Sequence, residues 1–340
     1  MRLSAAIDRA PRRRRLRLIA AVFAGMVPTL VISGCNPLHG LSSPPANVTI
    51  TVGAVPGIEN ANLFLAQKDG YFTRAGVRVK IVRFLSVKSE IAALDNGSVD
   101  VIAADYGDMF FYQAQNAIYR VLADGYDAAP GVIEIVTLPS SNIKSPSDLA
   151  GRQIPVPDAE QVRAAAGDPN TLDLASAVSV LQSDGVNLAG VQWQPMLQTK
   201  AITELIDHKV PAILVSGLNV YTAQQQGAVE LVDACSGPTS GIPLDGFFAA
   251  TSWLREANNT AVAKEFRQGL YAADAAATMP GPIQAVLPAW LNITKSEADL
   301  VTTGTYPLST ITASLYRTAA LLNNEGTTGV EVNVAKMVVR

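Results

Sequence analysis

Val99-Asp100-Val101-Ile102-Ala103-Ala104 decides the fold of this 340-residue chain. Two similar stretches precede it: Val48-Thr49-Ile50-Thr51-Val52 and Val77-Arg78-Val79-Lys80-Ile81-Val82. All three stretches are rich in β-branched residues, which is typical of strands. Helical apolar spacing separates them at residues 60–68, with Asn60 as the cap, and at residues 88–96. Because strands that alternate with helices at this spacing form crossover units, we predict a parallel sheet.

The same alternation returns in the second half of the chain. Strands are predicted at 153–156, 191–194 and 212–215, and helices at 173–183 and 199–207. Ser145 with Asp148, and Thr294 with Glu297, have the spacing of capping boxes, which predicts helix starts near residues 146 and 295. The chain is therefore predicted to be an α/β protein with two units of similar plan.

Residues 1–34 have the features of an export signal. Five arginines at 12–17 precede an apolar run from Leu18 to Ile32, and Ser33-Gly34 stand before Cys35. We interpret this order as a bacterial lipoprotein signal peptide, cut before Cys35, whose acylated thiol would anchor the protein on the extracytoplasmic face of the cell membrane. The alternative is an ordinary secretory signal with an incidental cysteine. Residues 35–47 are predicted to be a flexible linker.

Composition limits the function classes. Residues 1–34 contain seven arginines and one aspartate, so their removal changes the formal net charge from −3 to −9. An acidic chain does not favour a nucleic-acid partner, which needs a basic face. If Cys35 is acylated, Cys235 has no partner for a disulfide, and we expect it to be a buried thiol. His39 and His208 supply neither a metal cluster nor a catalytic triad. We expect no metal, no cofactor and no catalytic residues.

Three groups of residues follow one another in a characteristic order and spacing. They are Gln67-Lys68-Asp69-Gly70-Tyr71-Phe72 with Ala75-Gly76-Val77, Ala93-Leu94-Asp95-Asn96-Gly97-Ser98-Val99-Asp100-Val101 and Ile143-Lys144-Ser145-Pro146-Ser147-Asp148-Leu149-Ala150-Gly151-Arg152. They resemble the successive signatures of the periplasmic binding proteins for alkanesulfonate, nitrate and thiamine precursors, and the similarity covers about residues 48–330.

The resemblance implies a two-lobed type II periplasmic binding protein fold. Each lobe would be a mostly parallel sheet flanked by helices, with the ligand cleft between them. We expect residues 48–140 and 241–340 in lobe one and residues 141–240 in lobe two, because Pro, Ser and Gly interrupt the pattern near 138–141 and 237–243. The implied partners are a small-molecule solute, on which the hinge closes, and an ABC permease with its ATPase. We expect a monomer.

Eleven residues are predicted to bind the ligand, because ligands of open parallel sheets lie beyond the carboxyl ends of the strands. Most of them are polar and follow a predicted strand. In lobe one they are Glu59, Asn60, Asp105, Tyr106, Asp108, Asp124 and Tyr126, and in lobe two Asp158, Gln198, Ser216 and Asn219.

Several of these residues also have a structural interpretation. Asp108 and Asp158 could be helix N-caps, and Asp124 could be a turn residue before Gly125. Asp105 is favoured as a ligand contact, since it ends a strand before a Tyr-Gly pair. Tyr106 and Tyr126 could stack on a ring or a cation, with packing in the core as the alternative for Tyr126.

The acids at these positions favour a small nitrogen-containing solute, either cationic or heteroaromatic, over an anion. Two alternatives stay open within the same fold: a sulfonate or nitrate binder, and an enzyme related to thiamine or pyrimidine chemistry. A third is a sensor or scaffold lipoprotein that has lost its permease.

Overall fold

The computed structural model describes residues 48–116, 118–157, 171–324 and 332–339. The predicted signal peptide, Cys35, the linker and Asp158 lie outside these residues. Within them, no helix combines the length and the apolar character needed to cross a membrane.

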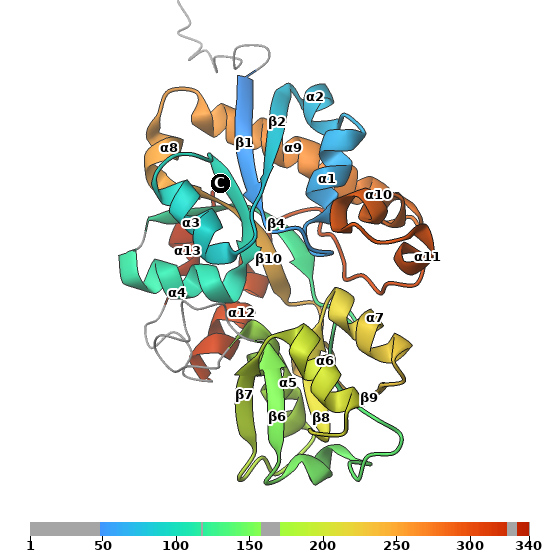
Figure 1. Cartoon of the computed structure of the whole chain (residues 1–340). Coiled ribbons are helices and arrows are strands. Elements are labelled where there is room, and N and C mark those ends of the chain that lie inside the picture. Colours follow the sequence, from blue (N-terminus) through green and yellow to red (C-terminus); the bar gives the residue numbers. More distant parts are fainter. Residues whose placement is uncertain (1–47, 117, 158–170, 325–331, 340) are drawn as a thin grey trace, which may run out of the picture. The chain divides into compact units, whose positions relative to one another are not determined.

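Lobe one is built on a five-stranded sheet with the order β2-β1-β3-β10-β4 (Figure 1). Strand β1 pairs in parallel with β2 and β3, while β10 is antiparallel to both β3 and β4. The predicted strands at 48–52, 77–82 and 99–104 are confirmed. The strands are β1 (Val48–Ala54), β2 (Val77–Arg83), β3 (Val101–Asp105), β4 (Tyr119–Asp127) and β10 (Pro243–Ala250).

Helices from both ends of the chain cover this sheet. The rings of Phe72 and Phe266 stack at 5.1 Å between their centroids, which joins α2 to α9 under the sheet. Val52, Val101 and Phe248 form the fully buried centre. The helices are α1 (Ala61–Lys68), α2 (Tyr71–Ala75), α3 (Val87–Asp95), α4 (Tyr106–Asn116), α8 (Thr251–Arg255), α9 (Asn259–Ala277), α10 (Pro282–Leu291), α11 (Lys295–Ala298) and α13 (Val334–Met337).

Lobe two contains two smaller sheets. Strand β5 lies between β8 and β9 and is antiparallel to both, and β6 pairs in parallel with β7. Its strands are β5 (Ile133–Thr137), β6 (Gln153–Pro157), β7 (Gln192–Met196), β8 (Ala212–Ser216) and β9 (Val229–Asp233). Its helices are α5 (Leu172–Ser183), α6 (Gln198–Ile206), α7 (Leu218–Gln225) and the short 3-10 turns Pro146–Leu149 and Gly237–Thr239.

The chain crosses between the lobes at 128–132 and returns at 234–242. The return overlaps the predicted segment 237–243. The first crossing comes ahead of the predicted segment 138–141, because the Pro-Ser-Ser break there follows the end of β5 and not the end of β4. Cys235 lies in the return segment and is buried, as expected, and burial raises the pKa of its thiol to about 12.

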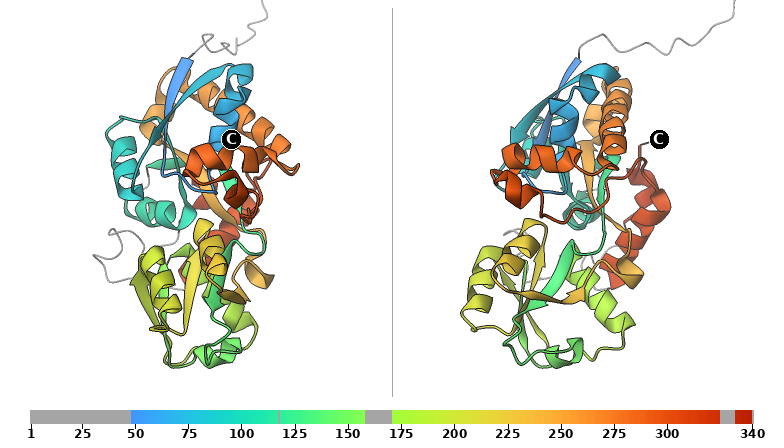
Figure 2. Two further views of the ribbon diagram at one scale, coloured as in Figure 1. Left: turned by 45° about the vertical axis from the view of Figure 1, so that its right-hand side comes forward. Right: turned by 90° about the vertical axis from the view of Figure 1, so that its right-hand side faces the viewer.

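Helix α12 (Thr312–Asn324) packs against α4 of lobe one and α5 of lobe two (Figure 2) and braces the return crossing. Arg317 donates to the carbonyl oxygens of Pro238 (3.0 Å) and Ser240 (3.1 Å), and the Thr318 hydroxyl donates to Pro243 O (3.0 Å). Ahead of the helix, the Thr305 backbone exchanges two hydrogen bonds with Asp127, where the first crossing begins.

Candidate functional site

A cavity of about 640 Å³ is lined by residues of both lobes. Lobe one contributes the ends of β1 and β3, the start of α4 and the first residues of β10. Lobe two contributes the ends of β6 and β8 and the starts of α5, α6 and α7. The acids that line it are Glu59, Asp105, Asp108, Asp173 and Asp245. Eight of the eleven predicted binding residues also line it: Glu59, Asn60, Asp105, Asp108, Tyr126, Gln198, Ser216 and Asn219.

Glu59 lies in the loop between β1 and α1 and reaches towards lobe two. Its carboxylate is folded over Gly57, where a Cβ atom would lie only 1.7 Å from Oε1. Its Oε2 lies 4.0 Å from the place of a Cβ atom on Gly217, just before α7. Burial raises the pKa of Glu59, and the nearby Asp173 raises it further. Any side chain at residue 57 would therefore displace this carboxylate from the cavity.

Asn60 holds the same loop in place. Its Nδ2 donates to Val55 O (2.9 Å), while its Oδ1 accepts from the Gly57 N–H (3.1 Å) and from Trp290 Nε1 (3.0 Å). Trp290 also donates to Gly57 O at 2.9 Å. The side chain of Asn60 makes no capping bond to α1, which corrects its predicted role as a helix cap. It positions Glu59 through the backbone of the loop.

The helix cap considered for Asp108 belongs to Asp105 instead. The Asp108 N–H donates to Asp105 Oδ1 at 2.9 Å, so Asp105 caps α4 and Asp108 lies in its first turn. The physical reason is that β3 leads directly into α4, which places the cap position on the last residue of the strand. Both side chains nevertheless line the cavity.

Tyr106 and Asp124 are buried away from the cavity lining. The Tyr106 hydroxyl donates to Asp124 Oδ1, and Asp124 Oδ2 accepts from the Ile311 N–H at 3.2 Å. Asp124 lies inside β4 and not in a turn, and burial raises its pKa to about 6. These two residues anchor the segment that leads into α12.

Two acids that the sequence did not single out complete the site. Asp173 lies in the first turn of α5, and burial raises the pKa of its carboxyl, while the Ser216 hydroxyl lowers it. Asp245 lies near the start of β10. Burial raises the pKa of Asp245 well above its ordinary value, followed by the charges of Glu59, Asp105, Asp173 and Asp108 in that order. The carboxyls of both lobes therefore act on one another across the cavity.

The remaining polar residues of lobe two are tied to the backbone. Gln198 Oε1 accepts from the Ser216 N–H at 2.8 Å, and its Nε2 donates to Ser216 Oγ at 3.3 Å. This pair joins the start of α6 to the end of β8. Asn219 is the second residue of α7 and also lines the cavity.

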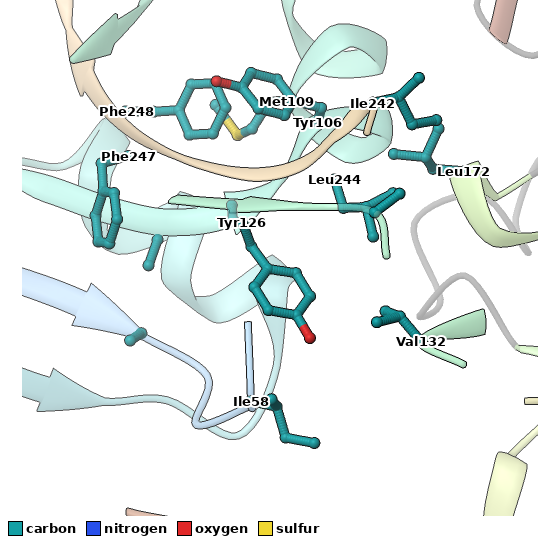
Figure 3. Close-up of a cluster of buried hydrophobic side chains, with 14 of the residues drawn as sticks. Ile58, Tyr106, Met109, Tyr126, Val132, Leu172, Ile242, Leu244, Phe247 and Phe248 are labelled. Carbon is teal, nitrogen blue, oxygen red and sulfur yellow. The ribbon is translucent and has the colours of Figure 1, made fainter. Parts of the chain in front are cut away.

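Apolar side chains and one cation make up the rest of the lining. Figure 3 shows Ile58, Tyr126, Val132 and Leu244 around this region. Among the lining residues that the structure describes, Arg83 is the only basic one; its guanidinium lies 4.5 Å from the centre of a Trp290 ring and donates to Ala289 O. No group of acids, histidines or cysteines in the described parts of the chain is arranged to hold a metal ion.

Two α/β lobes with a polar pocket between them define the class of periplasmic binding protein folds, and comparisons with solved structures agree. The aliphatic sulphonate binding protein SsuA of Escherichia coli is 17% identical over 85% of this chain and 96% of its own, with a TM-score of 0.66. The ligand-binding component of an ABC-type import system from Staphylococcus aureus, solved with zinc bound, is 11% identical over 86% and 96%, with a TM-score of 0.65. The desulfurization enzyme DSZB, in complex with biphenyl-2-sulfinic acid, is 14% identical over 87% and 97%, with a TM-score of 0.65.

The model of the NMT1/THI5 like family matches residues 58–278, and the chain belongs to that family. A search of curated protein sequences gives no match.

Proposed function

We propose that this protein is the solute-binding component of an ABC importer and that it takes a small, cationic, nitrogen-containing solute. It would act on the extracytoplasmic side of the membrane, held by an acylated Cys35, and pass its solute to a permease. Family membership and the fold support the binding role, as does the similarity to the import-system component of Staphylococcus aureus. The ligand class rests on the site itself.

The observation that carries the ligand class is the charge of the cavity. Five carboxyl groups line about 640 Å³, and the guanidinium of Arg83 is engaged by Trp290 and by Ala289 O. A cation in this space gains from every carboxylate around it, while an anion is repelled by each of them. Helix N-termini attract anions, but Asp105 and Asp173 already occupy the starts of α4 and α5.

An anionic solute is the alternative supported by similarity, since the Escherichia coli neighbour binds sulphonates. The two ligand classes are separated by thermal shift on the purified protein. We expect choline, putrescine or thiamine to raise the melting temperature, because a ligand that binds only the native state stabilises it. Methanesulfonate and nitrate serve as the matched anions. Stabilisation by the anions, with none by the cations, would overturn the proposed ligand class.

An enzymatic role is the alternative suggested by the neighbour DSZB. Among the lining residues that the structure describes there is no cysteine or histidine, and His208 lies beyond the end of α6, away from this cavity. We therefore expect mass spectrometry to recover a bound cation unchanged after prolonged incubation. Its conversion into a product would support the enzyme instead.

A further inference from the structure

The carboxyls of this cavity come from separate elements and converge on Asp245. Glu59 comes from the β1–α1 loop, Asp105 and Asp108 from the start of α4, and Asp173 from α5 of lobe two. Arg83, at the end of β2, is the only cation among the described lining residues, and Tyr126 of β4 also borders the space. Like charges in an enclosed space of low dielectric repel strongly. The empty cavity therefore cannot keep all of these groups ionised at low cost.

We infer that the cavity exchanges protons for the charge of its solute: when empty it keeps protons on Glu59, Asp173 and Asp245, and a cation that enters displaces them into solvent. This inference rests on the proposed function, since it needs a cationic solute. No bond to the solute is made or broken. Each carboxyl O–H loses its proton to water, and the positive charge of the solute takes its place beside the carboxylate.

The titration behaviour of the three groups supports the exchange. Burial is the largest cause of the raised pKa of Glu59, of Asp173 and of Asp245, and neighbouring acids raise each one further. A cation bound among them acts in the opposite direction, because an opposite charge within a few ångströms favours the ionised form. The affinity of a cation should therefore rise with pH through the range in which the empty cavity loses its protons.

Tyr126 gives a second, independent indication of a ligand. Its side chain is only 2% exposed, and its hydroxyl accepts from the Gly304 N–H, which leaves its own proton without an acceptor among the described residues. Figure 3 shows this hydroxyl pointing between Ile58 and Val132, both of which line the cavity. A buried donor of this kind calls for an acceptor. A solute with a hydroxyl or carbonyl oxygen beside its cationic nitrogen satisfies it.

Choline is a suitable probe, because its quaternary nitrogen carries a permanent charge and cannot titrate. Titration calorimetry at pH 7 in phosphate and in Tris, which differ in ionisation enthalpy, reports the protons released on binding. We expect the binding enthalpies measured in the two buffers to differ in the direction that proton release gives. We also expect the affinity for choline to rise by up to about tenfold per pH unit for each proton released. Binding with equal heats in the two buffers would overturn the exchange and leave the proposed function standing. Absence of choline binding would overturn both for this ligand.

A ligand-free measurement tests the stored protons separately. A carboxyl whose pKa is raised by folding binds more protons in the native state, so its contribution to stability is present at low pH and is lost as pH rises towards the raised pKa. We expect the melting temperature of the empty wild type to fall as the pH rises above about 4, the ordinary pKa of a free carboxyl, and Asp245→Asn to reduce that fall. The exposed Asp184→Asn is the matched control. An equal fall in Asp245→Asn and the wild type would contradict proton storage at this site.

Discussion

At the scale of single residues, the acids of the pocket divide between structural work and ligand contact. Asp105 does both, since it caps α4 and also lines the cavity. Asp124 is wholly engaged by Tyr106 and Ile311 and is too deeply buried to reach a solute. The residue type alone does not separate these roles, because the same carboxylate suits a helix cap, a buried anchor and a cation site.

Substitution of Asp105 separates its two roles. Asp105→Ala should lower the free energy of unfolding by about 1 kcal/mol through loss of the cap, while Asp105→Asn, which can still accept from the Asp108 N–H, should lose only a few tenths. Urea denaturation measures both. If both variants weaken choline binding while only Asp105→Ala is destabilised, the carboxylate charge acts on the solute. Equal destabilisation of both variants would count against the cap.

Trp290 holds the loop that carries Glu59 through hydrogen bonds to Gly57 O and Asn60 Oδ1. Trp290→Phe removes the donor to Gly57 O and Asn60 Oδ1, so we expect a loss of about 1 to 3 kcal/mol in unfolding free energy. It should also weaken choline binding, because Glu59 is no longer held at the cavity. Trp253→Phe, at a half-buried tryptophan remote from this loop, is the control. Unchanged affinity in Trp290→Phe would show that the loop is held by other contacts.

Much of the site could be predicted from the sequence, because the rule of carboxyl ends applies to parallel strands. Glu59 follows β1, and Asp105 is the last residue of β3, which runs parallel to β1. Ser216, the last residue of β8, also lines the cavity, although β8 pairs antiparallel with β5. Asp245 was missed because β10 runs antiparallel to β3. The cavity therefore lies at the amino end of β10, whereas the rule considers only the carboxyl ends of strands. Asp173 was missed because it stands in the first turn of a helix, where an acid is ordinary.

At the scale of elements, the sheet to which β5 belongs explains why the first crossing differs from the expected one. Strand β5 pairs with β8 and β9, which moves the first crossing forward to 128–132. Pro and Gly mark where a strand stops, but they do not tell which sheet it belongs to, since long-range pairing decides that. The brace formed by α12 has no local signal either, because its bonds join residues about 75 positions apart.

The brace is testable at Thr318, a fully buried residue of α12. Thr318→Val keeps the shape of the side chain but leaves Pro243 O without this donor, so we expect a loss of about 1 to 2 kcal/mol in unfolding free energy. The exposed Thr73→Val in α2 should change stability by less than about 0.5 kcal/mol. Urea denaturation of both variants is the measurement. A loss no larger than that of Thr73→Val would show that the bond contributes little.

At the scale of the whole molecule, a solute between two lobes should draw them together. We expect small-angle scattering to give a smaller radius of gyration with saturating choline than without it, because hinge closure removes open space between the lobes. Methanesulfonate at the same ionic strength is the control. An unchanged radius, with binding shown by calorimetry, would mean that the pocket fills without closure.

The proposed anchor predicts where the protein is found in the cell. Wild type should partition into detergent, since each buried methylene of an acyl chain contributes about 0.8 kcal/mol to membrane binding. Cys35→Ala should stay unprocessed or be released into the aqueous fraction, whereas Cys235→Ala, which leaves the proposed lipidation site intact, should behave as wild type. Fractionation and immunoblotting compare the three. A wild type found only in the aqueous fraction would refute lipidation.

The brace and the crossings also set the order in which the chain can fold. Lobe two is one continuous stretch, whereas lobe one needs partners from both ends of the chain: the hydrogen bond from Asn62 to Asp274 spans 212 residues and that from Trp290 to Gly57 spans 233. Contacts this distant in sequence form late. A chain synthesised from its amino end therefore exposes the apolar face of the lobe-one sheet until the residues up to 290 have been made and can pack against it. We expect lobe two to acquire hydrogen-exchange protection first, and the kinetic risk of aggregation to lie in lobe one.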